Sequence, residues 1–250
     1  MVDKISKWIK NYALDHKRKS LVIGISGGID SSVVSTLCAM TGLPVYAVSM
    51  PIAQIESQHD LSMEHGDWLT QKFTNVEHTL VDLDKIYDKF YLQMLPDFDN
   101  DMAYANTKSR LRMVTLHHIA GATQGLVVGT GNKVEDFGVG FYTKYGDGGV
   151  DISPIADLMK SEVWELGKQL GIMQEIIDAE PTDGLWEDGR TDKDQLQGLS
   201  YEQMEHAMVH GPDSEYYDKY QKIRKPNLHK MEPIPVFKND STTQTSNRKG

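Results

Sequence analysis

The first half of the chain alternates between two patterns of hydrophobic and polar residues. Near the N-terminus, Ile5, Trp8, Ile9 and Tyr12 recur at helical spacing with lysines between them, which predicts an amphipathic helix. Short apolar runs bounded by glycine or proline predict buried strands. Applied along this half, the two patterns predict helices over residues 2–18, 31–42, 57–73 and 101–124, and strands over residues 21–26, 43–51, 75–83 and 125–131.

Strands that alternate with helices predict an α/β fold with a Rossmann-like parallel sheet and helices on both faces. Such sheets bind ligands beyond the carboxyl ends of their strands, where the strand order reverses. The first strand is predicted to end at Ser26 and the fourth at Thr130. We therefore expect the loops after these two strands to open toward the same crevice.

The pattern changes in the second half of the chain. Glycines 138, 140, 146, 148 and 149 predict a flexible segment over residues 132–150, and residues 180–200 are acidic and rich in turn formers. Helices are predicted over residues 157–171, 201–209 and 214–224, and residues 241–250 are expected to form a disordered polar tail. With no internal repeat and no interdomain linker, we expect a single domain over residues 1–240.

Composition excludes several classes of protein. The formal net charge of −10 argues against a basic surface that binds nucleic acid. No apolar run reaches the roughly 18 residues that a membrane span needs. Cys38 is the single cysteine, so neither an internal disulfide nor a cysteine-based zinc site can form, and its apolar helical surroundings predict a core position. We expect a cytoplasmic protein.

The first strand leads into the sequence SGGIDSS, residues 26–32. Gly27 and Gly28 allow a tight turn and a close approach to a ligand, and the following helix offers unpaired N–H groups to an anion. Asp30 beside a phosphate would need a cation between them, which indicates Mg²⁺. Neither the Walker pattern nor the dinucleotide fingerprint is present. The alternative is an ordinary turn with a serine or aspartate cap.

The SGGxDS loop resembles the pyrophosphate-binding loop of the N-type ATP pyrophosphatases, whose fold is described as adenine nucleotide alpha hydrolase-like. Three further stretches are similar to the ammonia-dependent NAD synthetases within that group. They are NTKSRLRM at residues 106–113, the stretch containing FYTKYGDGG at 129–164, and the stretch containing PTDGLWED at 180–205, which LHK follows at 228–230. The basic residues of the first stretch could equally form a solvated face.

This resemblance implies a ligase that uses ATP, deamido-NAD⁺ and ammonia, with Mg²⁺ as cofactor. The nicotinate carboxylate would attack the α-phosphorus of ATP, giving an acyl-adenylate and pyrophosphate, and ammonia would then release AMP and NAD⁺. Carboxylates do not react usefully with ammonia at neutral pH, so adenylation supplies the leaving group. The resemblance further implies a homodimer, with candidate contacts on the helices at 2–18 and 101–124, and no glutaminase domain.

Residue roles carry over by position from the family. The resemblance makes Asp30 and Lys160 catalytic, and makes Asp30 and Glu135 the Mg²⁺ ligands. The ATP contacts it implies are Gly24, Ile25, Ser26, Gly27, Gly28, Ile29, Asp30, Ser31, Thr130, Lys160 and Thr182. The deamido-NAD⁺ contacts it implies are Arg110, Lys144, Asp151, His229 and Lys230. Taken singly, Lys160 could be a surface lysine of a first helical turn, and Glu135 a solvated carboxylate.

The sequence departs from the family's common form after Thr130. Where many members have Asp-His-Ala-Ala-Glu, this chain has Gly-Asn-Lys-Val-Glu at residues 131–135. The interval from Glu135 to Lys144 is also one residue longer than in the common branch, which leaves the register of residues 136–142 open. Three alternatives remain: a GMP synthetase-type domain, a tRNA-thiolating enzyme, and an ATP-binding module without catalysis.

Overall fold

The computed structural model describes residues 1–52, 56–186 and 188–239, with the backbone alone at residues 56–58. The polar tail expected at residues 241–250 lies outside the described residues, as does Glu187 within the PTDGLWED stretch. Among the described helices, none combines the length and the apolar character that crossing a membrane would require.

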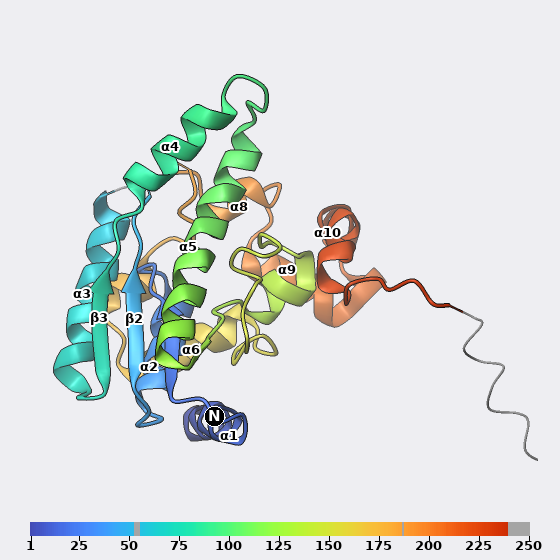
Figure 1. Ribbon diagram of the computed structural model, residues 1–250. Coiled ribbons are helices and arrows are strands. Elements are labelled where there is room, and N and C mark those ends of the chain that lie inside the picture. Colours follow the sequence, from blue (N-terminus) through green and yellow to red (C-terminus); the bar gives the residue numbers. More distant parts are fainter. Residues whose placement is uncertain (53–55, 187, 240–250) are drawn as a thin grey trace, which may run out of the picture.

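A parallel sheet forms the centre of the molecule (Figure 1). Its strands are β1 (Ser20–Gly24), β2 (Val45–Ser49), β3 (Val76–Leu80) and β4 (Gly125–Val127), arranged in the order β3-β2-β1-β4. The strand order reverses between β1 and β4, which places the predicted crevice between the loops that follow these strands. The α/β fold class predicted from the pattern is confirmed.

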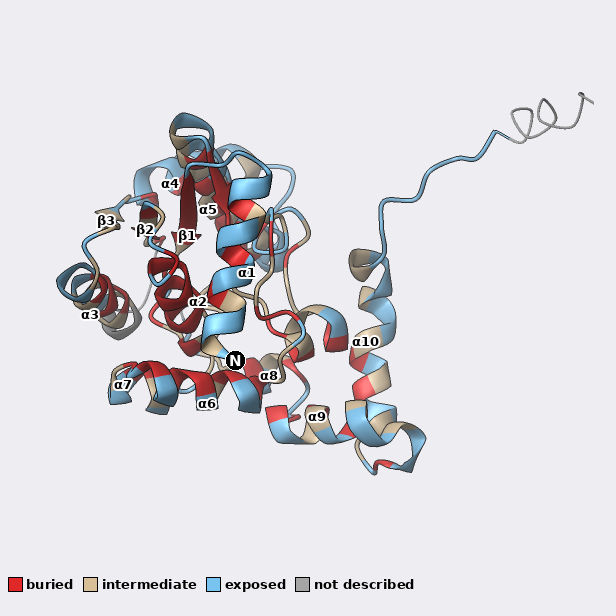
Figure 2. Ribbon diagram, turned by 90° about the horizontal axis from the view of Figure 1, so that it is seen from below, coloured by how far each residue is buried: buried red, intermediate tan, exposed pale blue. Residues whose placement is uncertain are grey.

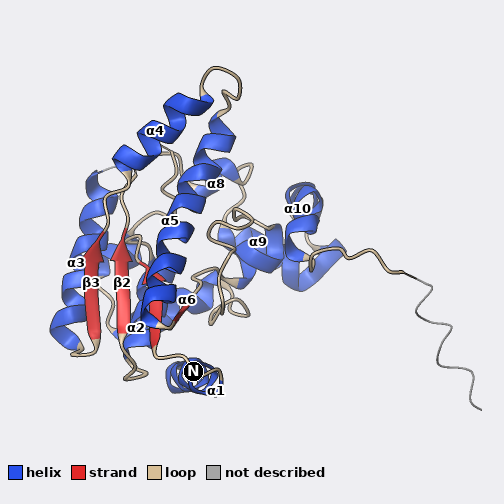
Figure 3. Ribbon diagram, in the orientation of Figure 1, coloured by secondary structure: helices blue, strands red, loops and turns tan. Residues whose placement is uncertain are grey.

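Helices cover both faces of the sheet (Figure 3). Leu21 and Ile23 of β1 pack on one face with helix α2, whereas Val22 packs on the other, because successive side chains of a strand point in opposite directions. The first face carries α1 (Val2–Asp15), α2 (Ile29–Ala39), α3 (Glu56–Lys72), α6 (Lys160–Leu170) and α7 (Gln174–Asp178), and the second carries α4 (Asp84–Met94) and α5 (Asp101–Thr123).

Helix α2 is buried along its length between the sheet and the outer helices (Figure 2). Cys38 belongs to this buried surface with no exposed area, and burial raises the pKa of its thiol. The core position predicted for Cys38 is confirmed. Burial of α2 on all sides fixes its N-terminus, which matters because the SGGIDSS loop enters the helix there.

A second apolar cluster lies beyond the β4 edge of the sheet (Figure 1). It joins a π-helix, η1 (Val134–Val139), to α9 (Tyr201–His210) and α10 (Tyr217–Met231). Leu196, which follows the short helix α8 (Asp192–Gln195), belongs to the same cluster. A one-turn 3₁₀ helix, η2 (Gly211–Asp213), connects α9 to α10. This cluster carries the glycine-containing segment and the C-terminal helix to the mouth of the crevice.

Several predicted boundaries are wrong. β1 ends at Gly24 rather than Ser26 and β4 at Val127 rather than Thr130, because the chain leaves the sheet there to form the two loops of the crevice. The first helix ends at Asp15, where Lys17 adopts a positive φ of 56°, and Trp8 remains 46% exposed rather than buried.

Other elements were not predicted at all. Helix α4 was missed although Ile86, Tyr87, Phe90, Tyr91 and Met94 recur at helical spacing; it buries only Tyr87 fully, and Tyr91 and Met94 pack beside it. Residues 134–139 form the π-helix η1 rather than a flexible segment. The short helix α8 lies in the stretch of residues 180–200 read as turns, and α7 lies just before it. The helix predicted over residues 214–224 is present as α10, but it runs to Met231 and includes LHK.

Candidate active site

The SGGIDSS loop connects β1 to α2 at the reversal of strand order. Gly27 has a φ of +83°, a conformation that favours glycine. The hydroxyl of Ser31 lies 3.1 Å from that of Ser26 and donates to the carbonyl of Gly28 at 3.0 Å, which fixes the curvature of the turn. Gly28 is the N-cap of α2 and supplies no side-chain cap. The first N–H groups of α2 and its dipole therefore face the crevice without an anionic partner from the cap position.

Three charged side chains from distant parts of the chain meet beside this loop. The Lys160 ammonium lies 2.5 Å from Oδ2 of Asp30 and 3.0 Å from Oε1 of Glu135. Asp30 comes from the first turn of α2, Glu135 from η1, and Lys160 from the first residue of α6. The side-chain amide of Asn132 donates to Oδ1 of Asp30 at 3.0 Å, and its oxygen accepts the N–H groups of Val134 and Glu135.

Lys160 is almost completely buried, with 2% of its surface exposed, so it is not the surface lysine that a first helical turn usually carries. Burial by itself would lower the pKa of Lys160, but the carboxylates of Asp30 and Glu135 raise it above its ordinary value. The ammonium therefore stays charged at neutral pH. Its position supplies a fixed positive charge next to the uncapped N-terminus of α2, and both features attract phosphate oxygens.

Thr130 and Thr182, two of the residues assigned to ATP, lie outside the Asp30–Lys160–Glu135 group. Thr130 is half-buried in the loop after β4, three residues beyond the strand. The Thr182 hydroxyl donates to the carbonyl of Arg190 at 3.2 Å and accepts from the N–H of Gly184, so it organises its own loop. The structure shows no contact between either threonine and the Asp30–Lys160–Glu135 group.

The FYTKYGDGG segment, residues 141–149, docks against one face of α5. The carboxylate of Asp147 accepts from the Ser109 hydroxyl at 2.7 Å, the Thr143 hydroxyl donates to Asn106 at 2.6 Å, and Arg110 donates to the carbonyl of Lys144 at 3.3 Å. Positions 106, 109 and 110 lie on one helical face, which is why NTKSRLRM carries this polar spacing. The solvated basic face considered for that stretch is wrong for Lys108 and Arg112. The Lys108 ammonium donates to the carbonyl of Leu185, and Arg112 donates to that of Met50.

Four of the five residues assigned to deamido-NAD⁺ gather around this docked segment. Lys144 donates to the carbonyl of His229 at 3.4 Å, Lys230 donates to that of Tyr142 at 2.7 Å, and Arg110 holds Lys144 from the other side. These contacts bring the LHK stretch of α10 to the YGDGG segment. Asp151 lies elsewhere, because its carboxylate accepts the N–H of Val127 at 2.8 Å along the edge of β4.

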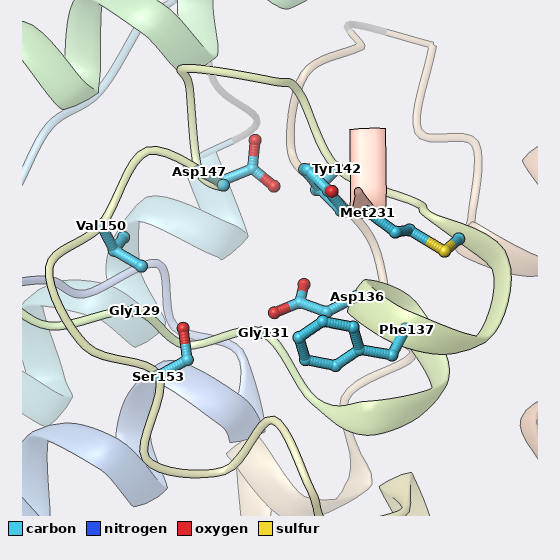
Figure 4. A pocket seen from close by; sticks show the side chains of 10 residues that line it. Gly129, Gly131, Asp136, Phe137, Tyr142, Asp147, Val150, Ser153 and Met231 are labelled. Atoms are coloured by element: carbon cyan, nitrogen blue, oxygen red, sulfur yellow. The ribbon is translucent and has the colours of Figure 1, made fainter. Parts of the chain in front are cut away.

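A cavity of about 120 Å³ opens between the carboxyl end of β4 and the docked segment (Figure 4). The carboxylates of Asp136 and Asp147 both point into it, beside the ring of Tyr142 and the side chain of Met231. Burial, together with the neighbouring Glu135, Asp147 and Asp30, raises the pKa of Asp136 to about 8. A Cβ at Gly131 would lie 2.2 Å from the Asp136 carboxylate, so any larger residue there would displace that carboxylate.

Sequence reasoning missed four polar residues of this region: Asn132, Asp136, Tyr201 and Asp192. Asn132 holds Asp30, Asp136 lines the cavity, and the Tyr201 hydroxyl contacts both Glu135 and Asp192. Asn132 could have been found from its place at the end of a predicted strand, opposite the SGGIDSS loop. No local pattern distinguishes Tyr201 or Asp192. Tyr201 reaches Glu135 across 66 residues of chain, and Asp192 stands out only by its burial.

The pair of carboxylates fits a magnesium ion bound together with phosphates. Among the described residues there is no group of three or more histidine, cysteine, aspartate or glutamate side chains that could hold a metal unaided. Asp30 and Glu135 nevertheless lie together, because both contact the Lys160 ammonium, and Mg²⁺ is commonly bound by one or two carboxylates plus substrate phosphates. The oxygen donors present therefore suit Mg²⁺ delivered with a nucleotide.

A parallel sheet whose phosphate-type loop lies at the reversal of strand order, facing paired carboxylates and a buried lysine, defines the class of α/β nucleotide-binding enzymes. Comparison with known proteins gives the family. The model of the NAD synthase family matches residues 1–234, so the chain belongs to that family. This confirms the resemblance drawn from the motifs and the assignment of the chain as a ligase.

Individual relatives agree with the family assignment. The NH(3)-dependent NAD(+) synthetase of Carboxydothermus hydrogenoformans is 34% identical over 232 residues, covering 91% of this chain and 93% of that protein. Among solved structures, the NMN synthetase of Francisella tularensis has a TM-score of 0.86 and 31% identity, covering 94% of this chain and 96% of the other. The NH3-dependent NAD synthetase of Campylobacter jejuni has a TM-score of 0.74 and 25% identity, covering 95% and 97%.

Proposed function

We propose that this chain catalyses the ATP-dependent amidation of deamido-NAD⁺ with ammonia, producing NAD⁺, AMP and pyrophosphate. The observation that carries the proposal is the convergence of Asp30, Glu135 and Lys160 beside the uncapped N-terminus of α2 in a member of the NAD synthase family. In that arrangement Lys160 and the N-terminus of α2 offer positive charge to ATP phosphates, and the two carboxylates offer negative charge to Mg²⁺. The group lies at the place where α/β sheets bind ligands.

In this proposal the β- and γ-phosphates are bound by the segment from Gly24 to Ser31, which includes most of the SGGIDSS loop. Its N–H groups and hydroxyls replace the lysine of a Walker loop, and the two phosphates leave together as pyrophosphate. Lys160 is held charged and positioned, so it can donate to a phosphate oxygen as negative charge develops on the leaving group. Asp30 and Glu135 would hold Mg²⁺, which neutralises phosphate charge when bound.

The nicotinate half of the substrate is assigned to the region around the docked YGDGG segment. Arg110, Lys144 and Lys230 offer cations there, and the cavity lined by Asp136 and Asp147 leads from it toward the carboxyl end of β4. The nicotinate carboxylate attacks the α-phosphorus, the bond to pyrophosphate breaks, and an acyl-adenylate forms. Ammonia then adds to the acyl carbon and AMP leaves.

Association into a homodimer is part of the proposal. Large apolar side chains are exposed on both helices that were candidates for a subunit contact: Trp8 and Leu14 on α1, and Met102 and Val114 on α5. Burial of such side chains against a second copy would be favourable.

A second substrate has support from one observation. The Francisella tularensis structure is described as an NMN synthetase, and its TM-score of 0.86 exceeds the 0.74 of the Campylobacter jejuni NAD synthetase. Nicotinate mononucleotide carries the same reactive carboxylate as deamido-NAD⁺ but lacks the adenylate half. The phosphate loop and the Asp30–Lys160–Glu135 group would serve both substrates unchanged.

One assay decides between these substrates. The chain is supplied with ATP, Mg²⁺ and ammonium together with deamido-NAD⁺, nicotinate mononucleotide or xanthosine monophosphate, and AMP and the amidated product are measured. We expect product from deamido-NAD⁺ with the highest kcat/KM. A higher kcat/KM with nicotinate mononucleotide would make the chain an NMN-forming enzyme, and product from xanthosine monophosphate alone would overturn the proposal.

A further inference from the structure

The Tyr201 hydroxyl lies between two carboxylates. Its oxygen is 2.6 Å from Oε1 of Glu135 and 2.7 Å from Oδ2 of Asp192. Tyr201 and Asp192 are 6% and 5% exposed, so water does not separate these groups. The Lys160 ammonium lies over the Tyr201 ring, 4.6 Å from its centre, which places the tyrosine against the same charged group that the phosphate loop faces.

The number of protons limits how these contacts form. A phenol carries one hydrogen and can donate it to one acceptor, so two ionised carboxylates would leave one short contact between lone pairs. One carboxyl group must therefore carry a proton.

Asp192 is the better candidate to hold that proton. Glu135 accepts from the Lys160 ammonium at 3.0 Å, which stabilises its ionised form. Asp192 forms no ion pair with a described residue, and its second oxygen, Oδ1, is buried without a hydrogen-bond partner among them. Burial and the nearby charge of Glu135 raise the pKa of Asp192 to about 7.

We propose that Asp192 is a protonated positioning residue that donates to Tyr201, which in turn donates to Glu135 and fixes the orientation of that carboxylate. The inference builds on the proposed function, in which Glu135 faces ATP and Mg²⁺. Oε1 of Glu135 accepts from both Tyr201 and Lys160, and these two contacts hold the carboxylate in one orientation.

The relay also reaches the loop that contains Thr182. The N–H of Asp192 donates to the carbonyl of Pro181 at 3.0 Å, and Thr182 is tied to Arg190 within the same loop. A shift of this loop would move Asp192 and release Tyr201. The orientation of Glu135 is thereby coupled to the position of Pro181 and Thr182.

Substitutions at position 192 test whether a hydrogen-bond donor is needed there. Asparagine keeps the shape and can donate from its amide as a protonated acid does, whereas alanine cannot. We expect Tyr201→Phe and Asp192→Ala to lower kcat about tenfold with KM for deamido-NAD⁺ changed less than about twofold, the size typical of groups that support metal-binding carboxylates. We expect Asp192→Asn to restore most of the kcat that Asp192→Ala loses.

Tyr220→Phe is the matched control. Tyr220 is also buried in the cluster with α9 and α10, and its hydroxyl donates to the carbonyl of Gly138 at 3.0 Å without touching a carboxylate. We expect this variant to lose some thermal stability and keep its kcat. Equal damage from Asp192→Asn and Asp192→Ala, or a wild-type kcat in Tyr201→Phe, would overturn the relay.

An infrared measurement tests the proton independently of catalysis. At pH 6 the wild-type protein should show the C=O band of a protonated carboxylic acid that is missing from Asp192→Asn, with the fold checked by circular dichroism. Identical spectra would show that Asp192 is ionised and would refute the relay. A wild-type chain that forms no product would refute the proposed function, while the infrared comparison would still decide the inference.

Discussion

Lys160 occupies a position that is unfavourable for a free cation. It begins helix α6, where the helix dipole repels positive charge, and its side chain is 3% exposed. Two carboxylates offset this, and the result is a charged lysine fixed at the phosphate loop. This burial supports the predicted contact between Lys160 and an ATP phosphate, which stays a proposal.

Asp30 provides the sharpest test of that proposal at the residue scale. Because Asp30 belongs to a buried ion pair, Asp30→Ala would remove both a charge and packing, and breaking such pairs is costly. Asp30→Asn keeps the volume and removes the charge. We expect kcat to fall about a hundredfold or more, since electrostatic stabilisation of this kind contributes at that scale.

The accompanying measurements are turnover and thermal unfolding of both proteins. Asp30→Asn should remain folded, because Glu135 still pairs with Lys160, but its unfolding transition should be lower than that of the wild type. Near-normal turnover in a folded Asp30→Asn protein would remove Asp30 from the metal site.

At the scale of elements, the segment whose register the sequence left open, residues 136–142, begins inside a π-helix. The interval from Glu135 to Lys144 was predicted to hold one additional residue, and the structure forms a π-helix there, at residues 134–139. A π-helix takes more residues per turn than an α-helix and often marks a functional site. Asn132 caps it by accepting the N–H groups of Val134 and Glu135, which positions the Glu135 carboxylate.

Packing between α6 and α2 can be tested with a pair of glycine substitutions. A Cβ at Gly167 of α6 would lie 2.6 Å from Cδ1 of Ile29, at the start of α2, whereas one at Gly121 of α5 would meet nothing within 4 Å. Both changes gain about 1 kcal/mol of helix propensity, and only the first crowds the core, at about 1–3 kcal/mol.

We therefore expect Gly121→Ala to be the more stable of the two by about 1–3 kcal/mol in urea unfolding. Equal stability would mean that Ile29 moves aside without cost. A lower affinity for ATP in Gly167→Ala alone would further link α6 packing to the phosphate loop, because Ile29 precedes Asp30 in the first turn of α2.

At the scale of the whole molecule, a buried histidine ties α3 to α2. His65 has no exposed surface, and its Nε2 lies 2.8 Å from the hydroxyl of Ser35, which itself donates to the carbonyl of Ser32. The proton on this imidazole therefore sits on Nε2. A second proton would go to Nδ1, which is buried without a partner among the described residues.

Acid should therefore destabilise the fold through His65. Burial, with a smaller contribution from His78, lowers the pKa of His65 from 6.5 to about 4. The unfolded chain binds a proton near pH 6.5 and the folded chain near pH 4, so stability is lost as the pH falls through this window. Between pH 7 and pH 5 this group should remove about 2 kcal/mol of unfolding free energy.

His65→Gln is the comparison, since its amide can still donate to Ser35 and does not titrate. Urea unfolding at pH 7 and pH 5 should show a smaller loss in this variant than in the wild type. The same loss in both proteins would assign the pH dependence to carboxylates or to His78.

The sequence by itself determined the α/β class, the order of the main elements, the loop after β1 and the family. Each of these depends on local pattern: apolar periodicity, glycine spacing, and motifs such as YGDGG and PTDGLWED, which the family model bears out. A single domain over residues 1–240 and a cytoplasmic location stay predictions from the sequence.

Tertiary structure decided which side chains meet. Asp30 and Lys160 are 130 residues apart, and Glu135 and Tyr201 are 66 apart, so no local pattern could show that the four share one charged cluster. It also decided burial, which turned a first-turn lysine into a fixed charge and gave Asp192 its raised pKa. Charges and protonation states depend on desolvation and on neighbours brought together by folding, and these exist only once the sheet, η1 and α9 have packed.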